Sequence, residues 1–207
     1  MLLFKNVSSN TLQNISFKIG SGELVLFFSR DEYSLNLLYK MIIGQLKPDD
    51  GLIKIESDLK KNSKIMGLCG ERNDILLPER TIFENLKFVL YFRKQWTEDF
   101  STKIRDTLKI MDIDYLAEKK VSQLMFHQQL RFKLARLLIF EPAVLLFSWP
   151  EKQLDEVNGR SLINIFQEFQ KKEITVLIFS AQKWLASYNF DCKKIFLKKE
   201  KMLSEKK

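Results

Sequence analysis

The sequence predicts an α/β fold with a parallel core sheet, an N-terminal antiparallel β-subdomain and an inserted helical subdomain. Residues 24–28 and 143–147 are short, wholly apolar runs, which are typical of strands buried on both faces of a parallel sheet. Segments of helical periodicity lie between such runs, an order that favours parallel strands joined by helical crossovers. The first strands instead alternate apolar with polar residues, which indicates an antiparallel sheet with one buried face.

The N-terminal part is predicted to begin with two antiparallel strands, over residues 2–7 and 11–19. In the second strand, the residues that alternate with polar ones are Ile15, Phe17 and Ile19. A helix is expected after strand 24–28, with a buried stripe formed by Leu35, Leu38, Met41 and Ile42. Gly44 suits the C-terminal cap of this helix. A turn over 47–51 then precedes strands that we predict over 52–56 and 64–69.

The segment between residues 81 and 116 has helical periodicity. Two apolar stripes mark two helices, one with Ile82, Leu86, Val89 and Leu90 and the other with Ile104, Leu108 and Met111. We therefore predict that residues 81–120 form a helical subdomain inserted into a single domain of residues 1–207. The remaining elements are expected in the order helix 127–140, strand 143–147, helix 155–171, strand 174–179, a short helix and strand 193–197.

Composition restricts the setting of the protein. With 207 residues, of which 45% are hydrophobic, the chain is large and apolar enough for one globular domain. Its longest apolar runs are far shorter than the roughly 20 residues that span a bilayer. The first residues lack the pattern of a secretory signal. Cys69 and Cys192 are too few for a disulfide framework or a zinc cluster, so we expect two reduced thiols in the cytoplasm and no metal site.

The formal net charge of +8 is unevenly distributed, with a Lys-rich stretch over residues 193–207. Nucleic-acid binding is disfavoured, because single-strand binding sites combine positive charges with aromatic side chains and this stretch offers only Phe196. Contact with anionic lipid and a solvated terminus without a function of its own are the two interpretations that stay open.

Residues 121–155 resemble the corresponding part of the ATP-binding subunits of ABC transporters. The positions in register are Leu124, Gln129, Arg131, Ala135, Arg136, Pro142, residues 143–147, Pro150, Leu154 and Asp155. The resemblance extends over nearly the whole chain and implies an ABC-type P-loop NTPase-like fold. Residues 75–86 and 142–146 are most similar to the cell-division ATP-binding protein FtsE, whose membrane partner is FtsX.

The reactive positions of this family carry other residues in this chain. In the phosphate loop, Ser29 and Ser34 stand at the glycines, Leu35 at the lysine and Asn36 at the magnesium-binding hydroxyl. Glu71 or Arg72 stands at the Q-loop glutamine, and Met125, Phe126 and His127 stand at the signature Ser-Gly-Gly. Ser148 and Trp149 stand at the magnesium-binding Asp and the catalytic Glu, and Ala181 stands at the switch histidine. The outline of the family is therefore present without the groups that hydrolyse ATP.

These replacements remove what a bound triphosphate needs. Without glycine, the loop cannot readily adopt the positive φ angles that aim successive N–H groups at phosphate oxygens. Leu35 has no positive charge, and Asp31 and Glu32 would repel an anion or cap the helix that follows. His127 is interpreted as a polar residue at a helix start. We therefore expect no ATP, no magnesium and no catalytic residue.

The resemblance implies a cytoplasmic protein at the inner face of the cell membrane. We predict a catalytically inactive, FtsE-like subunit that is a scaffold or coupling partner of a membrane protein, FtsX-like or an export permease, in cell division or transport. Its partner groove would contain Leu76, Leu77, Phe83, Phe88 and Phe92, for which a core role is the alternative. Asp155 would face a second ABC subunit in a homodimer or heterodimer.

The sequence also leaves three other functions open. One is the inactive half of a heterodimeric ABC ATPase, in which the active half supplies the missing groups. Another is an ATPase that retains ATP binding through an unconventional site. A basic module that binds nucleic acid or a lipid surface is the third.

Overall fold

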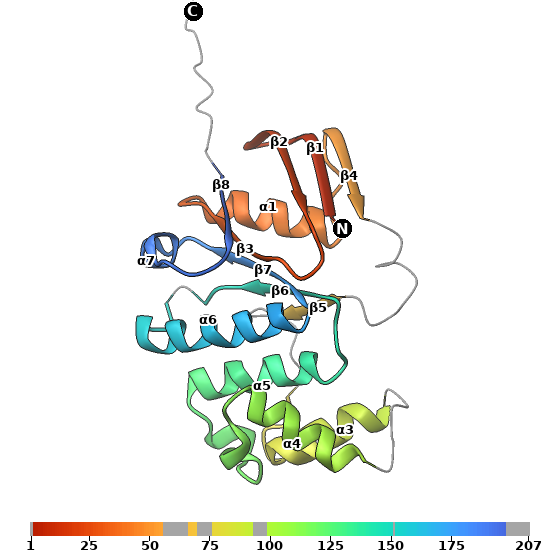
Figure 1. Cartoon of the computed structure of the whole chain (residues 1–207), viewed down its shortest axis with the longest axis vertical. Helices are drawn as coiled ribbons and strands as arrows, with labels where there is room; N and C mark the ends of the chain where they lie inside the picture. Colours follow the sequence, from red (N-terminus) through yellow and green to blue (C-terminus); the bar gives the residue numbers. More distant parts are fainter. Residues whose placement is uncertain (1, 56–65, 70–75, 93–98, 151, 198–207) are drawn as a thin grey trace, which may run out of the picture.

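The structure, a computed structural model, describes residues 2–55, 66–69, 76–92, 99–150 and 152–197. The strands of these residues form two sheets (Figure 1). The smaller sheet is antiparallel with the strand order β2-β1-β4, and its strands are β1 (Leu2–Ser9), β2 (Leu12–Ile19) and β4 (Asp50–Ile55). The larger sheet is parallel with the order β5-β6-β7-β3-β8. Its strands are β3 (Leu24–Phe28), β5 (Met66–Cys69), β6 (Val144–Ser148), β7 (Thr175–Ser180) and β8 (Lys193–Phe196).

Helices lie on both sides of the parallel sheet. α1 (Glu32–Ile42) lies between the two sheets, and α5 (Phe126–Leu138) and α6 (Glu156–Lys171) lie on the other side (Figure 1). Beyond α5 is a helical layer that consists of α3 (Ile82–Phe92), α4 (Phe100–Ile110) and the short 3-10 turns η1 (Asp114–Leu116) and η2 (Val121–Gln123). The short helix α7 (Lys183–Ser187) connects β7 to β8. Within the described ranges, none of the helices combines the length and the apolar content that crossing a membrane requires.

The strands of the parallel sheet are buried on both faces. Alternate residues of a strand point to opposite faces of its sheet. Val25 and Phe27 accordingly pack with α1 and the antiparallel sheet, while Leu24 and Leu26 pack with α5, α6 and the helical layer. The sheet therefore separates two hydrophobic cores. Full burial of one such side chain contributes about 1.5–3 kcal/mol to stability.

This architecture confirms the predicted α/β fold with a parallel core sheet and an antiparallel N-terminal subdomain. The residues of the predicted helical stripes are buried, except for Val89, which is half-buried. Asn85 shares the buried face of α3, because its amide group donates to the carbonyl oxygens of Leu77 and Thr81. A hydrogen-bonded polar side chain can thus take a position that hydrophobic periodicity assigns to the core.

Several element ends differ from the predicted ones by one or two residues. α5 ends at Leu138, because the chain turns at Glu141 with a left-handed φ of 53°. β4 begins at Asp50, inside the predicted turn. Gly51 lies in this strand with a φ of 87°, and an added Cβ would come within 2.3 Å of the carbonyl oxygen of Asn6. Only glycine permits this close approach of β4 to β1.

Backbone pairing joins the two ends of the segment of residues 81–120. Thr81 and Lys120 form an isolated antiparallel bridge, next to which the amide of Ile82 donates to the carbonyl oxygen of Lys119 at 3.0 Å. The chain therefore enters and leaves the segment of residues 81–120 at adjacent points.

Candidate functional site at the carboxyl edge of the parallel sheet

Three loops meet at the carboxyl edge of the parallel sheet, which is where open α/β sheets bind ligands. After β3, the amide of Ser29 donates to the carbonyl oxygen of Ser180 at 3.3 Å. After β6, the amide of Trp149 donates to the carbonyl oxygen of Phe179 at 2.9 Å. The predicted site positions that these loops bring to one edge are Ser29, Ser148, Trp149 and Ala181.

A carboxylate occupies the start of α1. Asp31 is the N-cap residue, with φ −97° and ψ 100°. Its Oδ1 accepts a hydrogen bond from the amide of Tyr33 at 3.3 Å, and its Oδ2 accepts one from Ser34 Oγ at 2.7 Å. Aspartate is favoured here because it satisfies a free N–H group and complements the helix dipole. The predicted capping role of Asp31 is confirmed, whereas Glu32 is exposed in the first turn.

The loop between β3 and α1 contains no left-handed residue. Residues 29–36 are all described, and none of them has a positive φ. The Oγ of the buried Ser29 accepts a hydrogen bond from the amide of Asp31 at 3.1 Å. A phosphate nest needs successive N–H groups that converge through residues of alternating handedness. Here the amides of Asp31 and Tyr33 instead donate to side-chain oxygens of the loop itself.

The β1–β2 hairpin is bound to the same loop. Thr11 Oγ1 and Ser34 Oγ lie 2.8 Å apart, and Asn10 Nδ2 donates to the hydroxyl oxygen of Tyr33 at 2.9 Å. Asn10 has the left-handed φ of 49° that suits a tight hairpin. The antiparallel sheet is thereby joined by side-chain hydrogen bonds to the first turn of α1.

Leu35 and Asn36 lie on different sides of α1. The side chain of Leu35 is 6% exposed and belongs to the core between α1 and the antiparallel sheet. Asn36 is exposed. The position that the family resemblance assigns to a phosphate-binding lysine therefore contributes to packing in this chain.

An aromatic cluster fills the end of β6. Trp149 is 3% exposed, and its ring centroid lies 5.7 Å from that of Phe147 and 5.8 Å from that of Trp184, both in edge-on geometry. Gly159 of α6 makes room for the indoles, since an added Cβ would lie 2.8 Å from Trp184 and 2.9 Å from Trp149. Trp149 Nε1 is buried and has no hydrogen-bond partner among the described residues. A packed apolar side chain thus stands where the resemblance places the catalytic glutamate.

The other positions around this edge differ in exposure. Ser148 is exposed at the end of β6. Ala181 is half-buried after β7, next to a turn in which the amide of Gln182 donates to Ser180 Oγ at 3.0 Å. The predicted Q-loop position Glu71 lies outside the described residues.

The positions of the signature motif form the start of α5. Met125 is the exposed N-cap residue, and its amide donates to Gln128 Oε1 at 3.0 Å. Phe126 is half-buried against the core, and His127 is half-buried in the first turn. This start of the helix agrees with the interpretation of His127 as a polar helix-start residue.

These residues do not fit a magnesium–triphosphate group. Such a group needs converging N–H donors, a lysine near the β- and γ-phosphates, and oxygen ligands for the metal. The corresponding places hold the Asp31 carboxylate, the Leu35 side chain and the buried Trp149. One carboxylate at 4 Å from an anionic group costs about 4 kcal/mol at an effective dielectric of 20. In the described ranges, His, Cys, Asp and Glu side chains form no group of three that could hold a metal ion.

Two of the predicted partner residues pack against the core, and the backbone of a third is hydrogen-bonded to a buried side chain. Leu76 and Phe83 are half-buried and contact the core, as the alternative interpretation expected. The Arg105 guanidinium lies 5.7 Å from the centre of the Phe83 ring. Leu77 is held by the buried Asn85, which accepts from the Leu77 amide at 2.9 Å and donates to its carbonyl oxygen at 3.0 Å.

The other two partner residues lie on the outer side of α3. Phe88 and Phe92 are 46% and 66% exposed, and their ring centroids are 4.3 Å apart. Tyr91 is 67% exposed and lies 6.0 Å from Phe92. Leu86 and Leu90, on the inner side of the helix, are fully buried. Phe88, Tyr91 and Phe92 therefore form an exposed surface, which we name the α3 aromatic face.

Asp155 is the N-cap of α6 and not its first helical residue. Its Oδ1 accepts from the amide of Asn158 and its Oδ2 from Asn158 Nδ2, both at 2.8 Å. These hydrogen bonds, the one from the amide foremost, lower the pKa of the carboxyl, and the nearby His127 acts in the same direction. Asp155 is exposed at the start of α6, which lies away from α3 (Figure 1).

The protonation of Cys192 follows from its surroundings. Burial raises the pKa of its thiol to about 11, an effect that Lys194 opposes and Asp191 reinforces. The thiol is therefore protonated at neutral pH and is a poor nucleophile. Cys192 is free and half-buried.

Two polar features of the structure have no signal in the sequence pattern. One is the pair of hydrogen bonds between the hairpin and α1. The other is Arg131, which is buried and joins the helical layer to α6, since Nη1 donates to the Asp112 carboxylate at 2.9 Å and Nη2 to Ser161 Oγ at 2.6 Å. Asp112 has a left-handed φ of 54°. The family resemblance marks Arg131, but only the fold reveals its partners.

Comparison with known proteins gives sequence relatives over most of the chain. A protein-family profile described as ABC transporter matches residues 12–150. The Fe(3+) ions import ATP-binding protein FbpC of Vibrio cholerae is 29% identical over 178 residues, which are 84% of this chain and 51% of that protein. The spermidine/putrescine import ATP-binding protein PotA of Legionella pneumophila is 27% identical over 176 residues, 81% of this chain and 47% of that protein. The chain spans about half the length of these curated relatives.

Solved structures share the fold. That of cbiO1 from Clostridium perfringens, described as part of the ABC transporter complex cbiONQ, has a TM-score of 0.74 and 23% identity, and the match covers 87% of this chain and 78% of that one. A dimeric bacterial ABC transporter cassette has a TM-score of 0.72 and 22% identity, with 95% and 94% of the two chains covered.

Proposed function

The chain belongs to the ABC transporter family of ATP-binding cassettes, and on this premise we propose that it is a cassette subunit that couples to a membrane permease without hydrolysing ATP. The observation that carries this proposal is the carboxylate of Asp31, which caps α1 where the family binds phosphate. The buried Leu35 and Trp149 support it, because neither side chain offers a charge or a proton-transfer group. The fold of the cassette would then serve as a scaffold.

The surface proposed for the permease is the α3 aromatic face. Exposed aromatic side chains that contact one another form a larger apolar patch than scattered ones, and such patches mark protein interfaces. The cassette would act at the inner face of the membrane as one domain of residues 1–207, with residues 81–120 as its helical subdomain. The relatives FbpC and PotA are named for import, so a permease is the partner class that we propose. An FtsE-like role with an FtsX-like partner in cell division stays a prediction.

A second candidate function is the inactive half of a heterodimer. It is favoured by two exposed apolar side chains, Met125 at the N-cap of α5 and Val157 in the first turn of α6, two residues after Asp155. A cassette dimer is among the similar structures. In this case a second cassette would cover these residues and supply the missing catalytic groups.

Titration of the purified full chain with magnesium-ATP tests the proposal. Trp149 and Trp184 lie at the carboxyl edge, so their fluorescence reports on binding there. We expect no saturable change up to millimolar nucleotide, while an ATP-binding cassette measured in parallel responds. Binding in the micromolar range, or hydrolysis by the chain alone, contradicts the proposal. Hydrolysis that appears only with a second cassette supports the heterodimer.

Photocrosslinking in cells tests the proposed surface. A photoreactive residue at Phe88 should link the chain to an integral membrane protein, identified by mass spectrometry. Tyr115, which is 71% exposed and lies in η1, is the matched control position and should give no such product. The same membrane protein at both positions, or none at Phe88, argues against the α3 aromatic face.

A further inference from the structure

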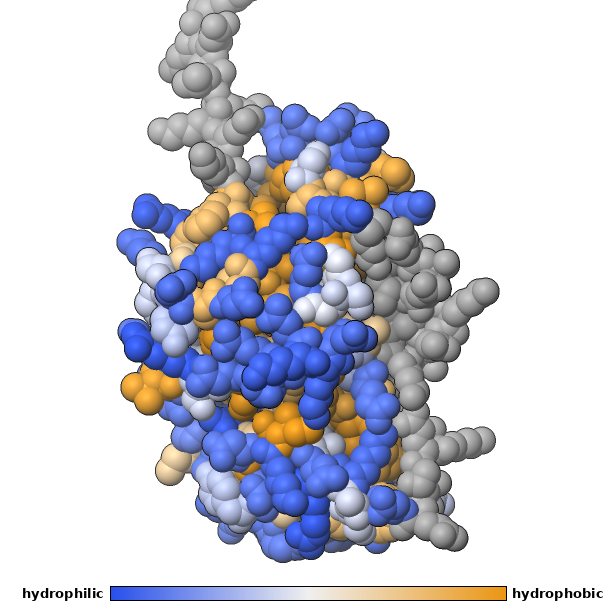
Figure 2. All heavy atoms as spheres, viewed as in Figure 1, coloured by the Kyte–Doolittle hydropathy of each residue, from blue (hydrophilic) through white to orange (hydrophobic). Residues whose placement is uncertain are grey.

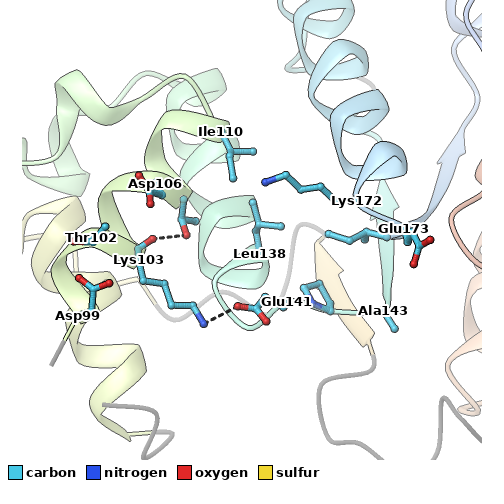
Figure 3. Close-up of a pocket in the computed structure, with 13 residues that line it drawn as sticks. Asp99, Thr102, Lys103, Asp106, Ile110, Leu138, Glu141, Ala143, Lys172 and Glu173 are labelled. Atoms are coloured by element: carbon cyan, nitrogen blue, oxygen red, sulfur yellow. Dashed lines mark hydrogen bonds and ion pairs between the residues drawn. The ribbon is translucent and has the colours of Figure 1, made fainter. Parts of the chain in front are cut away.

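A cavity of about 610 Å³ lies between the helical layer and the core, at the amino ends of β6 and β7 (Figure 3). It is therefore at the opposite edge of the sheet from the candidate site. Its volume is in the range of about 300–1,000 Å³ that is typical of small-molecule sites. The apolar floor is formed by Ile110, Leu138, Pro142, Ala143 and Ile174. Figure 2 shows a group of hydrophobic residues bordered by hydrophilic ones between α6 and the helical layer.

One wall of the cavity is α4, which contributes two carboxylates. Asp99 is the N-cap residue of α4 but makes no side-chain capping bond. In the described part of the chain, it also has no ion-pair partner. Among the described residues, the ion-pair partner of Asp106 is Lys109 at 3.8 Å, and both side chains are more than half exposed. Such a pair is worth little, so both carboxylates are available to a ligand.

The opposite wall is the turn between α6 and β7, which contributes an ammonium group. The side chain of Lys172 points into the cavity toward Ile110 and Leu138 (Figure 3). Among the described residues, it has neither a hydrogen-bond nor an ion-pair partner. A second ammonium, that of Lys103, is already bound to the Glu141 carboxylate at 3.0 Å. Glu173 of the same turn also lines the cavity, but its carboxylate points away from the Lys172 side chain (Figure 3). The uncompensated charges that face the cavity are therefore negative on α4 and positive on the opposite wall.

We propose that this cavity binds a zwitterion of the size of an amino acid or dipeptide. Its ammonium group pairs with Asp106, its carboxylate pairs with Lys172, and its aliphatic part lies on the apolar floor. A dication would meet the Lys172 ammonium, and a dianion would meet the α4 carboxylates, so each would place like charges together. This inference uses no residue of the carboxyl edge and is independent of the proposed function.

The position of the cavity gives binding a structural consequence. The ligand contacts α4 of the helical layer and the α6–β7 turn of the core at the same time. The Lys103–Glu141 ion pair joins the same two parts of the molecule, next to the cavity. A bound zwitterion adds a second connection and should slow amide hydrogen exchange in α4.

The test is calorimetric titration of the full chain with glycyl-leucine, which has both charges and an apolar side chain. Isopentylamine and 3-methylbutanoate, which carry only one charge each, are the comparison ligands. We expect saturable binding of the dipeptide and at least about tenfold weaker binding by Lys172→Met and by Asp106→Asn, since each removes one charge-assisted hydrogen bond. Lys171→Met is the matched control, because Lys171 pairs with Glu168 and does not line the cavity.

Three outcomes overturn the proposal. They are the absence of dipeptide binding at millimolar concentration, equal affinity of Lys172→Met and the unmodified chain, and amine binding as tight as that of the dipeptide. Thermal unfolding of each variant shows whether it is folded. All three substitutions are at exposed residues, so we expect unchanged melting temperatures.

Discussion

The Oδ2 atom of Asp31 lies 2.7 Å from the Oγ atom of Ser34, within the first turn of α1. The Asp31 carboxylate thus places a negative charge of the chain itself at the positive end of the helix dipole. Ser34 Oγ in turn lies 2.8 Å from Thr11 Oγ1 of the β1–β2 hairpin. A single carboxylate thus stabilises the helix start and, through Ser34, its contact with the antiparallel sheet.

Asp31→Ala should lower the free energy of unfolding by about 0.5–2 kcal/mol, the usual cost of losing an N-cap. Asp31→Asn keeps an acceptor for the Tyr33 amide, so its loss should be smaller. Urea denaturation measures both values. An alanine variant as stable as the unmodified chain contradicts the capping role.

Trp149→Glu should not create an ATPase. It should lower the stability of the protein, because it buries a carboxylate at a position that is 3% exposed. Burial raises the pKa of such a carboxyl in the folded state above that in the unfolded state. The variant is then least destabilised below about pH 4.3, the ordinary pKa of glutamate, and loses stability as the pH rises above it. Urea midpoints of the variant and the unmodified chain test this, because their difference should be larger at pH 8 than at pH 4.

Trp149→Phe is the matched control, since it keeps an aromatic ring and removes the unpartnered Nε1–H group. The loss of ring volume opposes the gain from removing a buried unsatisfied donor, so we expect a change within about 1.5 kcal/mol. A loss as large as that of Trp149→Glu would show that packing, and not charge, governs this position.

Gly159→Ala should destabilise the protein by about 1–3 kcal/mol, although alanine is the better helix former. The reason is that an added Cβ would lie 2.8 Å from the Trp184 ring and 2.9 Å from the Trp149 ring. Trp184→Leu should remove one of these two contacts and lower the cost of the alanine, so the two substitutions should be non-additive in a double-mutant cycle. Additive losses would contradict direct packing of α6 against this ring.

Phe88→Ala and Phe92→Ala should change stability by less than about 0.5 kcal/mol each, as expected for exposed residues. Phe83→Ala should cost more, because Phe83 packs against the core. Thermal unfolding gives the three values. A large loss at Phe88 would place it in the core and weaken its assignment to the α3 aromatic face.

Asp155 should contribute to the acid sensitivity of the protein. The pKa of its carboxyl is lower in the folded state than the ordinary 3.8. Its stabilising contribution is therefore complete above that value and is lost as the pH falls through the folded-state pKa. Asp155→Asn should flatten the dependence of the urea midpoint on pH between about 5 and 2. Parallel curves for the two proteins would contradict this contribution.

The pattern of local residues is enough to predict several features of the site. Asp31 follows a strand and precedes a helical stripe, and an N-cap depends on only three consecutive peptide units, so its role is visible in the sequence. The contact of Thr11 with Ser34 is different, because it depends on the register of β1 against β2 and on the place of α1 below them. Sequence periodicity contains no information on which hydroxyl groups meet.

The amino-acid sequence by itself determined the order of strands and helices, the two faces of the parallel sheet and the absence of glycine and lysine from the loop before α1. These features are set by hydrophobic periodicity and by the residue at a single position. Only the tertiary structure decided that Trp149 packs against Trp184 beside Gly159, and that Asp106 and Lys172 line one cavity. The physical reason is that such contacts join residues distant in sequence, whose distances are set by how whole helices and strands pack together.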